Sequence, residues 1–210
     1  MVLPTPPVWA PPGATKRTLG VDVSRYQPNI DWSQVRSDGI RIAYCKATEG
    51  QTYKSPPYSV QMHGAEGAGL RVGWYHFYRP KGDPAAEAQW ALSEAGWVKT
   101  WLPPMLDVEV TDGVSPVDIV AGMKVWLELV EARAGVPPII YTSPGFWREI
   151  GNPMGFTHYP LWVAHYAVSK PRIPDGWTAP VAWQFTSSGM VKGIRGPVDL
   201  NLWFQPREEV

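Results

Sequence analysis

Two carboxylates stand two positions apart in the stretch "PPMLDVEVTD", residues 103–112, which is otherwise rich in strand-forming apolar residues. On a strand, side chains at positions i and i+2 point to the same face, so Asp107 and Glu109 are expected to lie side by side. Two charged carboxylates in a partly dry site repel each other strongly. One of the two is therefore expected to keep its proton at a pH well above its ordinary pKa.

A protonated carboxyl beside an ionised one is the pair of groups that glycoside hydrolysis requires. The alternative is structural, because each acid could instead form an ion pair with an Arg or Lys or coordinate a cation, and perturbed carboxylates are often of this kind. The motif alone leaves both interpretations open.

Short apolar runs recur along the chain and predict eight strands, at residues 19–24, 39–46, 70–78, 104–110, 137–143, 160–166, 180–187 and 197–204. Helical patterns lie between several of them, one with Asp83 as the expected N-cap and Pro84 in the first turn. This alternation predicts an α/β protein with a parallel sheet, closed into a compact (β/α)8-type barrel. The connections after residue 141 are short and rich in Gly and Pro, so the expected barrel is irregular and lacks some outer helices.

Closure would bring four carboxylates together, because active sites of such barrels lie at the carboxyl ends of the strands. Asp22 ends the first apolar run, and Asp107 and Glu109 end the fourth. Asp199 lies in the eighth run, which closure sets beside the first. An open sheet would scatter these acids, whereas a barrel gathers all four at one mouth.

Twelve Trp and nine Tyr are a high aromatic content, which suits either a large core or a cleft that stacks against sugar rings. The candidate sugar contacts near predicted strand ends are Tyr44, Tyr75, Tyr141, Trp162, Tyr166 and Gln184. For each aromatic residue taken singly, core packing is the equal alternative. His76 is expected to be a core histidine with satisfied hydrogen bonds.

The composition limits the possible partners. Lys+Arg and Asp+Glu both number 19, so the chain lacks the basic footprint of a nucleic-acid-binding protein. The single cysteine, Cys45, lies in an apolar run and is expected to be a small buried hydrophobe. No Cys/His cluster indicates zinc, so neither a metal nor a cofactor is expected.

The first eighteen residues contain five prolines and no periodicity, which predicts an extended arm outside the core, followed by a barrel domain over residues 19–210. The N-terminus does not have the pattern of a signal peptide, and no segment has the length and apolarity of a membrane span. Insertion into a membrane is therefore not expected, and a monomer is the default expectation.

Seven segments occur in order along the chain: "GVDVSRYQPNIDW", "AYCKATEG", "GAGLRVGWYHFYRP", "PMLDVEV", "IIYTSPGFW", "LWVAHY" and "AWQFTSSGMVKGIRGPVDLNLW". With them the chain resembles the family 25 glycoside hydrolases, the Chalaropsis-type lysozymes, from roughly Thr18 to Phe204. The resemblance implies a flattened eight-stranded barrel. It also implies hydrolysis of the β-1,4 bond between N-acetylmuramic acid and N-acetylglucosamine, with peptidoglycan glycan strands as the partner.

The resemblance also implies roles for the four acids. Glu109 matches the general acid/base, and Asp107 matches the residue that orients the substrate's 2-acetamido group or otherwise stabilises the transition state. Asp22 and Asp199 match the two other active-site acids of the family. Whether one of the aspartates is a covalent nucleophile stays open, and net retention of anomeric configuration is expected in both cases.

One departure and two alternatives accompany the resemblance. Lys54 and Ser55 occupy a stretch in which the family often has an Asp, so a contact at the cleft rim is expected to change. A catalytically inactive carbohydrate-binding barrel is the main alternative, although a binder would have no reason to keep four clustered acids. A chitin-hydrolysing enzyme would carry a longer acidic strand motif, D-x-x-D-x-D-x-E, which this chain lacks. A phage endolysin that acts from the host cytoplasm on the cell wall is the expected setting, and a bacterial autolysin or an exported effector fits the same residues.

Overall fold

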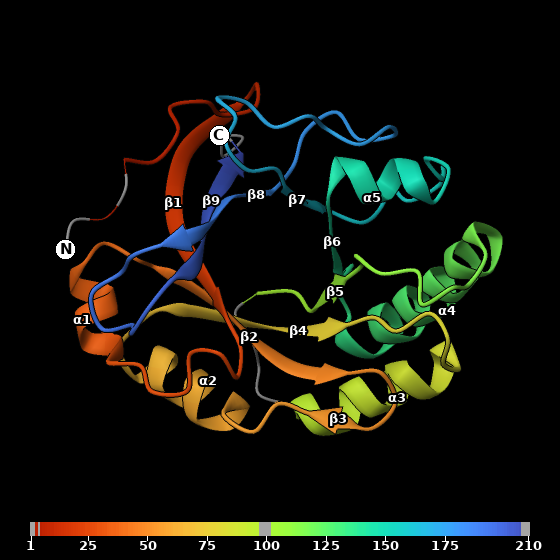
Figure 1. Cartoon of the computed structure of the whole chain (residues 1–210), viewed down its shortest axis with the longest axis horizontal. Coiled ribbons are helices and arrows are strands. Elements are labelled where there is room, and N and C mark those ends of the chain that lie inside the picture. The colour runs from red at the N-terminus through yellow and green to blue at the C-terminus, as the bar shows by residue number, and fades with distance from the viewer. Residues whose placement is uncertain (1–2, 4, 97–101, 207–210) are drawn as a thin grey trace.

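The computed structural model describes residues 3, 5–96 and 102–206, and these form one mixed α/β barrel (Figure 1). The strands are β1 (Ala14–Val23), β2 (Ile42–Glu49), β3 (Tyr53–Lys54), β4 (Arg71–Phe77), β5 (Met105–Asp107), β6 (Ile139–Thr142), β7 (Leu161–Ala164), β8 (Ala182–Gly189) and β9 (Val198–Pro206). Their order in the sheet is β1-β9-β8-β7-β6-β5-β4-β2-β3, and an additional β1–β2 pairing closes the barrel. The short β3 is only an antiparallel extension of β2. The predicted eight-stranded barrel is confirmed.

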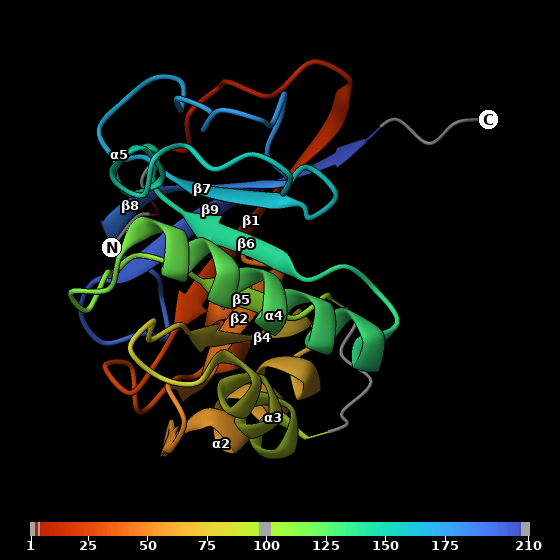
Figure 2. The same cartoon turned by 90° about the vertical axis from the view of Figure 1, so that its right-hand side faces the viewer.

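Five helices lie outside the sheet: α1 (Trp32–Ser37), α2 (Tyr58–Gly67), α3 (Pro84–Ala95), α4 (Pro116–Ala134) and α5 (Pro144–Glu149). The side chain of Asp83 accepts hydrogen bonds from the backbone N–H groups of Ala85 and Ala86, so it caps α3 as predicted. The connections after β6 contain only the short α5, and Figure 2 shows loops rather than long helices beside β7 and β8. None of the helices in the described ranges is long and apolar enough to span a membrane.

The expectation of a parallel sheet is wrong for β9. This strand runs antiparallel to both β8 and β1, while the pairs from β1–β2 and β2–β4 through β7–β8 are parallel. The N-terminal end of β9 therefore lies at the mouth of the barrel, where the other strands end. This reversal places Asp199, the second residue of β9, directly opposite Asp22 of β1.

The N-terminal segment differs from the expected arm outside the core. Strand β1 begins at Ala14, so residues 14–18 belong to the sheet and pair with β9. Before the strand, Trp9 packs edge-on against Trp183 and Phe204, with ring centroids 6.0 and 5.6 Å apart. The segment thus covers the outer face of β8 and β9, a part of the barrel that the long helices leave open (Figure 1).

Aromatic rings fill the inside of the barrel. The ring of Tyr44 stacks on that of Trp203, with 5.2 Å between their centroids, and meets that of Trp162 edge-on at 5.0 Å. All three rings are buried. Two glycines make room for them, since a Cβ at Gly73 would lie 2.5 Å from the Tyr44 ring and one at Gly20 2.7 Å from the Trp203 indole nitrogen. This packing supports the floor of the mouth. A second, larger apolar layer lies between the sheet and the helices.

Candidate active site

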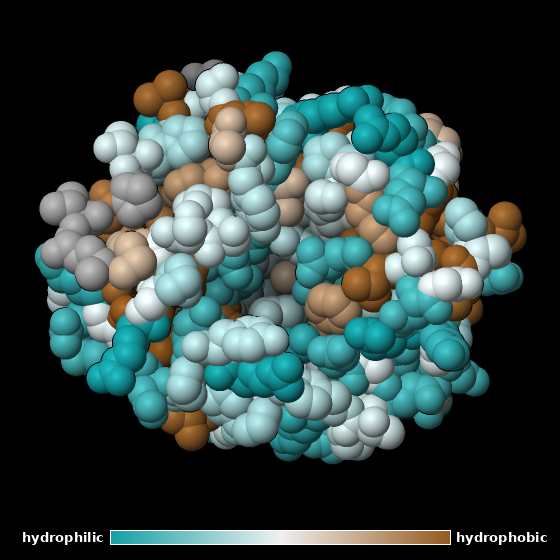
Figure 3. Space-filling view, viewed as in Figure 1, coloured by the Kyte–Doolittle hydropathy of each residue, from teal (hydrophilic) through white to brown (hydrophobic). Residues whose placement is uncertain are grey.

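A cleft of about 240 Å3 opens at the mouth of the barrel, where the parallel strands end. Its lining residues are Asp22, Ser24, Tyr26, Lys46, Tyr75, Phe77, Met105, Asp107, Glu109, Tyr141, Tyr166, Gln184 and Asp199. Figure 1 looks toward this mouth, and Figure 3 shows in the same view that the face is hollowed near its centre and mostly hydrophilic around the hollow. The structure therefore brings together all four acids singled out from the sequence.

Asp22 is the second-last residue of β1 and is held by two side-chain amides. The Nε2 of Gln184 and the Nδ2 of Asn201 both donate to Asp22 Oδ2, at 2.9 and 2.8 Å. Burial raises the pKa of Asp22, and these two hydrogen bonds oppose that rise by stabilising the carboxylate. The arrangement favours an ionised Asp22 over its neighbouring acid.

Other donors fix the orientation of the two amides. The hydroxyls of Tyr141 and Tyr166 donate to Gln184 Oε1, the former at 2.8 Å, so the NH2 group of Gln184 must face Asp22. The indole N–H of Trp162 donates to Asn201 Oδ1 at 2.9 Å and orients Asn201 in the same way. The hydrogen-bond network thus points N–H groups at the carboxylate from two sides.

Asp199 is the protonated partner of Asp22. Burial and, next to it, the nearby charge of Asp22 together raise the pKa of Asp199 to about 8. The hydrogen bond between the two carboxyls lowers the pKa of Asp22 and raises that of Asp199, which is the pattern of Asp199 donating its proton to Asp22. At neutral pH this pair holds one proton, on Asp199.

Asp107 and Glu109 form a second pair. Asp107 is the last residue of β5 and is buried, whereas Glu109 follows the strand and is exposed at the cleft surface. Burial raises the pKa of both carboxyls, because cleft walls surround even the exposed Glu109. The charge of Glu109 and the hydrogen bond between the pair raise the pKa of Asp107 further, while the same bond lowers that of Glu109. The shared proton therefore lies on Asp107, and Asp107 Oδ1 has no hydrogen-bond partner among the described residues.

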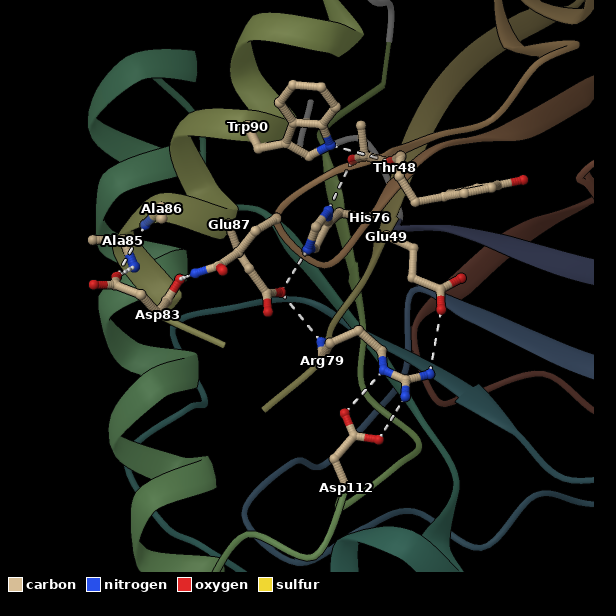
Figure 4. Close-up of polar contacts among 12 residues, drawn as sticks. Thr48, Glu49, His76, Arg79, Asp83, Ala85, Ala86, Glu87, Trp90 and Asp112 are labelled. Atoms are coloured by element: carbon tan, nitrogen blue, oxygen red, sulfur yellow. Dashed lines mark hydrogen bonds and ion pairs between the residues drawn. The ribbon is translucent and has the colours of Figure 1, made fainter. Parts of the chain in front are cut away.

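A chain of ion pairs steadies the side of the cleft next to Glu109. Lys46 Nζ lies 2.6 Å from Glu49 Oε2. Arg79 bridges Glu49 at 3.3 Å and Asp112 at 2.8 Å (Figure 4). Arg79 Nε also donates to Asp112 at 2.9 Å, so the contact is bidentate. These contacts tie the loop after Glu109 to β2 and to the end of β4. The positive charge of Lys46 lowers the pKa of both Asp107 and Glu109.

His76 is a core residue, as predicted. It is fully buried on β4, with Thr48 Oγ1 2.8 Å from Nδ1 and Glu87 Oε2 2.9 Å from Nε2 (Figure 4). Burial lowers the pKa of His76, although Glu87 opposes the shift. The histidine connects the sheet to α3 and does not line the cleft.

The candidate sugar contacts divide into two groups. Tyr75, Tyr141, Tyr166 and Gln184 line the cleft. The expectation is wrong for Tyr44 and Trp162, which are fully buried in the barrel interior, where Tyr44 donates to the carbonyl of Pro103 at 2.9 Å. Strand β2 continues to Glu49, beyond the predicted end at residue 46, so Tyr44 lies deep in the barrel rather than at its rim.

Three residues of the site were not predicted from the sequence: Lys46, Tyr26 and Asn201. Lys46 is the last residue of a predicted strand, so the rule that selected the acids would have selected it too. Asn201 shares a strand face with Asp199, two positions away, and only the pairing of β9 with β1 shows that it reaches Asp22. Among the described residues no group of three or more His, Cys, Asp or Glu side chains could hold a metal ion.

Two larger cavities continue the cleft on either side. One of about 790 Å3 shares Tyr26 with it, and one of about 600 Å3 shares Glu109 and Tyr166 with it. The four acids therefore lie in the middle of an extended open groove. Such a groove suits a chain-like ligand that passes across the barrel mouth.

The barrel and its acid-lined groove are those of a glycosidase, and the chain belongs to glycosyl hydrolases family 25, whose model matches residues 21–194. It is 35% identical over 206 residues to Lysozyme M1 of Streptomyces globisporus, covering 90% of this chain and 69% of that protein. It is 34% identical over 200 residues to the N,O-diacetylmuramidase of Chalaropsis sp, covering 86% and 95% respectively. The crystal structure of the Streptomyces coelicolor lysozyme has a TM-score of 0.86 at 34% identity and covers 92% of this chain and 94% of that one.

Proposed function

We propose that this chain is a lysozyme, which hydrolyses the β-1,4 bond between N-acetylmuramic acid and N-acetylglucosamine in bacterial peptidoglycan with retention of configuration. One observation carries the proposal: two carboxyl pairs, each sharing a single proton, lie in the middle of an open groove. They are Asp22–Asp199 and Asp107–Glu109. A glycan strand fits such a groove because it is a long polymer that must be cut internally. The names of the relatives support the choice of peptidoglycan.

Glu109 is the proposed general acid, since it is the acid at the cleft surface, where the glycosidic oxygen of a bound strand would lie. The leaving oxygen must be protonated as its bond to the anomeric carbon breaks. The proton is available from the Asp107–Glu109 pair. When Asp107 gives up its proton to Glu109, it becomes a carboxylate that can accept a hydrogen bond from the substrate.

Asp107 is the proposed partner of the 2-acetamido group. Its Oδ1 is buried without a partner among the described residues, and a buried oxygen of this kind is costly unless a ligand satisfies it. An acetamido N–H would do so and would leave the acetamido oxygen free to attack the anomeric carbon. Water would then open the cyclic intermediate, with Glu109 accepting its proton, and the two inversions give net retention.

Asp22 and Asp199 complete the proposed site. The ionised Asp22, held by two amides, supplies negative charge for the oxocarbenium-like transition state. Tyr75, Tyr141, Tyr166 and Gln184 are the proposed sugar contacts, because their polar atoms or ring faces line the cleft. A monomeric state and a phage source remain predictions.

The experiment that tests the function is mass spectrometry of the soluble fragments released from purified peptidoglycan, after borohydride reduction of their new reducing ends. Fragments that end in reduced N-acetylmuramic acid are expected. Reduced N-acetylglucosamine ends would instead show a glucosaminidase. Binding to peptidoglycan without any released fragment would show an inactive carbohydrate-binding barrel.

A further inference from the structure

A second charged cavity, of about 460 Å3, lies at the end of the barrel opposite the acids. Arg41 and Arg71 line it where β2 and β4 begin, which is the edge away from the mouth. Lys16, Arg17 and Arg36 complete a set of five cationic side chains, and none of the described lining residues is acidic. The chain as a whole has no net charge, so this concentration of positive charge is local.

Backbone carbonyls, rather than carboxylates, hold three of the guanidinium groups. Arg17 Nη1 donates to the carbonyl of Pro7 at 2.7 Å, Arg36 Nη1 donates to that of Gly69, and Arg41 Nη1 donates to that of Arg36 at 2.7 Å. A carbonyl fixes the position of a guanidinium without neutralising its charge. A guanidinium has five N–H donors, so each of the three keeps donors for a further acceptor.

The structure also gives these five cations no ion-pair partner among the residues that it describes. Within the part of the chain that the structure describes, none of them lies within 4.0 Å of a carboxylate oxygen. Lys16 and Arg71 are exposed, and their side chains donate to no described residue. Five like charges gathered around one cavity repel each other, and a bound anion would remove that repulsion.

We propose that this cavity binds the phosphodiester backbone of an anionic cell-wall polymer, with poly(glycerol phosphate) as the model ligand. The planar guanidinium matches two oxygens of a phosphate at once, and several phosphates along a polymer would meet several of the cations. A compact cavity suits a short stretch of flexible polymer, whereas nucleic-acid binding uses a longer basic stripe. The choice of a wall polymer rests on the proposed lysozyme function, which brings the protein to the wall. Because the cavity and the acids lie at opposite ends of the barrel, the protein can hold the polymer while it cuts the glycan.

The test compares the binding of poly(glycerol phosphate) by the wild-type protein and by the double variant Lys16→Gln/Arg71→Gln, using isothermal titration calorimetry at low and at high salt. The matched control is Lys124→Gln/Lys170→Gln, which removes two charges from exposed positions outside the cavity. Wild-type binding is expected to weaken with salt, and the cavity variant is expected to bind roughly tenfold or more weakly at low salt with a shallower salt dependence. The control is expected to change binding by less than about twofold.

The proposal is overturned if poly(glycerol phosphate) does not bind, or if the control variant loses as much affinity as the cavity variant. It is also overturned if a single-stranded oligonucleotide or vesicles of anionic phospholipid bind more tightly at the same residues, since the cavity would then serve a different class of ligand. Hydrolysis of polymer-free peptidoglycan is measured in parallel and is expected to be equal in all three proteins. Hydrolysis without polymer binding refutes only this proposal, whereas polymer binding without hydrolysis refutes the lysozyme function.

Discussion

Replacing Asp199 by Asn is predicted to stabilise the protein at neutral pH. The folded protein keeps the proton of Asp199, because burial and the Asp22 charge raise its pKa to about 8. The unfolded chain loses that proton near the ordinary value of 3.8. Between these two values the folded state binds more protons than the unfolded state, so the free energy of unfolding falls as the pH rises.

The size of the effect follows from the two pKa values. Over the roughly three pH units between 3.8 and neutral pH, the ionisation of Asp199 favours unfolding by up to about 4 kcal/mol. Asp199 is only half-buried, so screening by solvent reduces the expected effect to about 2 kcal/mol. Asparagine removes this contribution because it is neutral in both states, and its amide can still donate to Asp22.

The assay is urea unfolding followed by tryptophan fluorescence, at about pH 4.5 and at about pH 7. The Asp199→Asn variant is expected to be more stable than the wild type at the higher pH and to approach it at the lower pH. Asp175→Asn, at an exposed position, serves as the control. A difference that does not depend on pH, or a loss of stability at neutral pH, would refute the assignment of the shared proton to Asp199.

Three further predictions concern the other side of the cleft and the barrel interior. Asp107→Asn and Asp107→Ala both remove the carboxyl that holds the shared proton, so Glu109 titrates alone and the alkaline limb of the kcat/KM profile should move to lower pH. The move should be larger in Asp107→Asn, because an amide donor still lowers the pKa of Glu109; a limb that stays in place in both variants would contradict the pairing. Arg79→Ala should lower kcat about tenfold with little change in KM, because Asp112 and the loop after Glu109 lose their anchor, and an unchanged kcat would rule out this positioning role. Tyr44→Phe should lower the free energy of unfolding by about 1 kcal/mol without changing KM, since the Tyr44 hydroxyl donates to a backbone carbonyl inside the barrel. A raised KM in this variant would show that Tyr44 contacts the sugar after all.

The strands and most helices could be predicted because their signals are local. Each strand is an apolar run bounded by Gly, Pro or polar residues. The start of α3 is likewise indicated by neighbouring residues, since Asp83 caps the backbone N–H groups of Ala85 and Ala86. The direction of β9 could not be predicted in this way, since an apolar run reads the same in a parallel and an antiparallel pairing. The prolines of the N-terminal segment suggested an extended chain, but nothing local showed that Trp9 would pack on β8 and β9.

The four acids of the site could be predicted from the sequence, but which acid of each pair holds the proton could not. The spacing of Asp107 and Glu109 indicated that one carboxyl would hold a proton, but which one depends on the burial of Asp107 at the strand end. The ionisation of Asp22 depends on amides from Gln184 and Asn201, which lie 162 and 179 positions away in the chain. Such contacts are products of barrel closure and leave no mark in the local sequence.

The most direct test of the catalytic account is the rate at which Glu109→Gln releases fragments from peptidoglycan, measured beside Glu128→Gln, an exposed glutamate on α4. If Glu109 donates the proton to the leaving oxygen, the rate should fall by about a hundredfold or more while the far-UV and near-UV circular dichroism spectra stay those of the wild type. The Glu128→Gln control should keep the wild-type rate. A folded Glu109→Gln protein with wild-type activity would contradict the assignment of the general acid and with it the proposed mechanism.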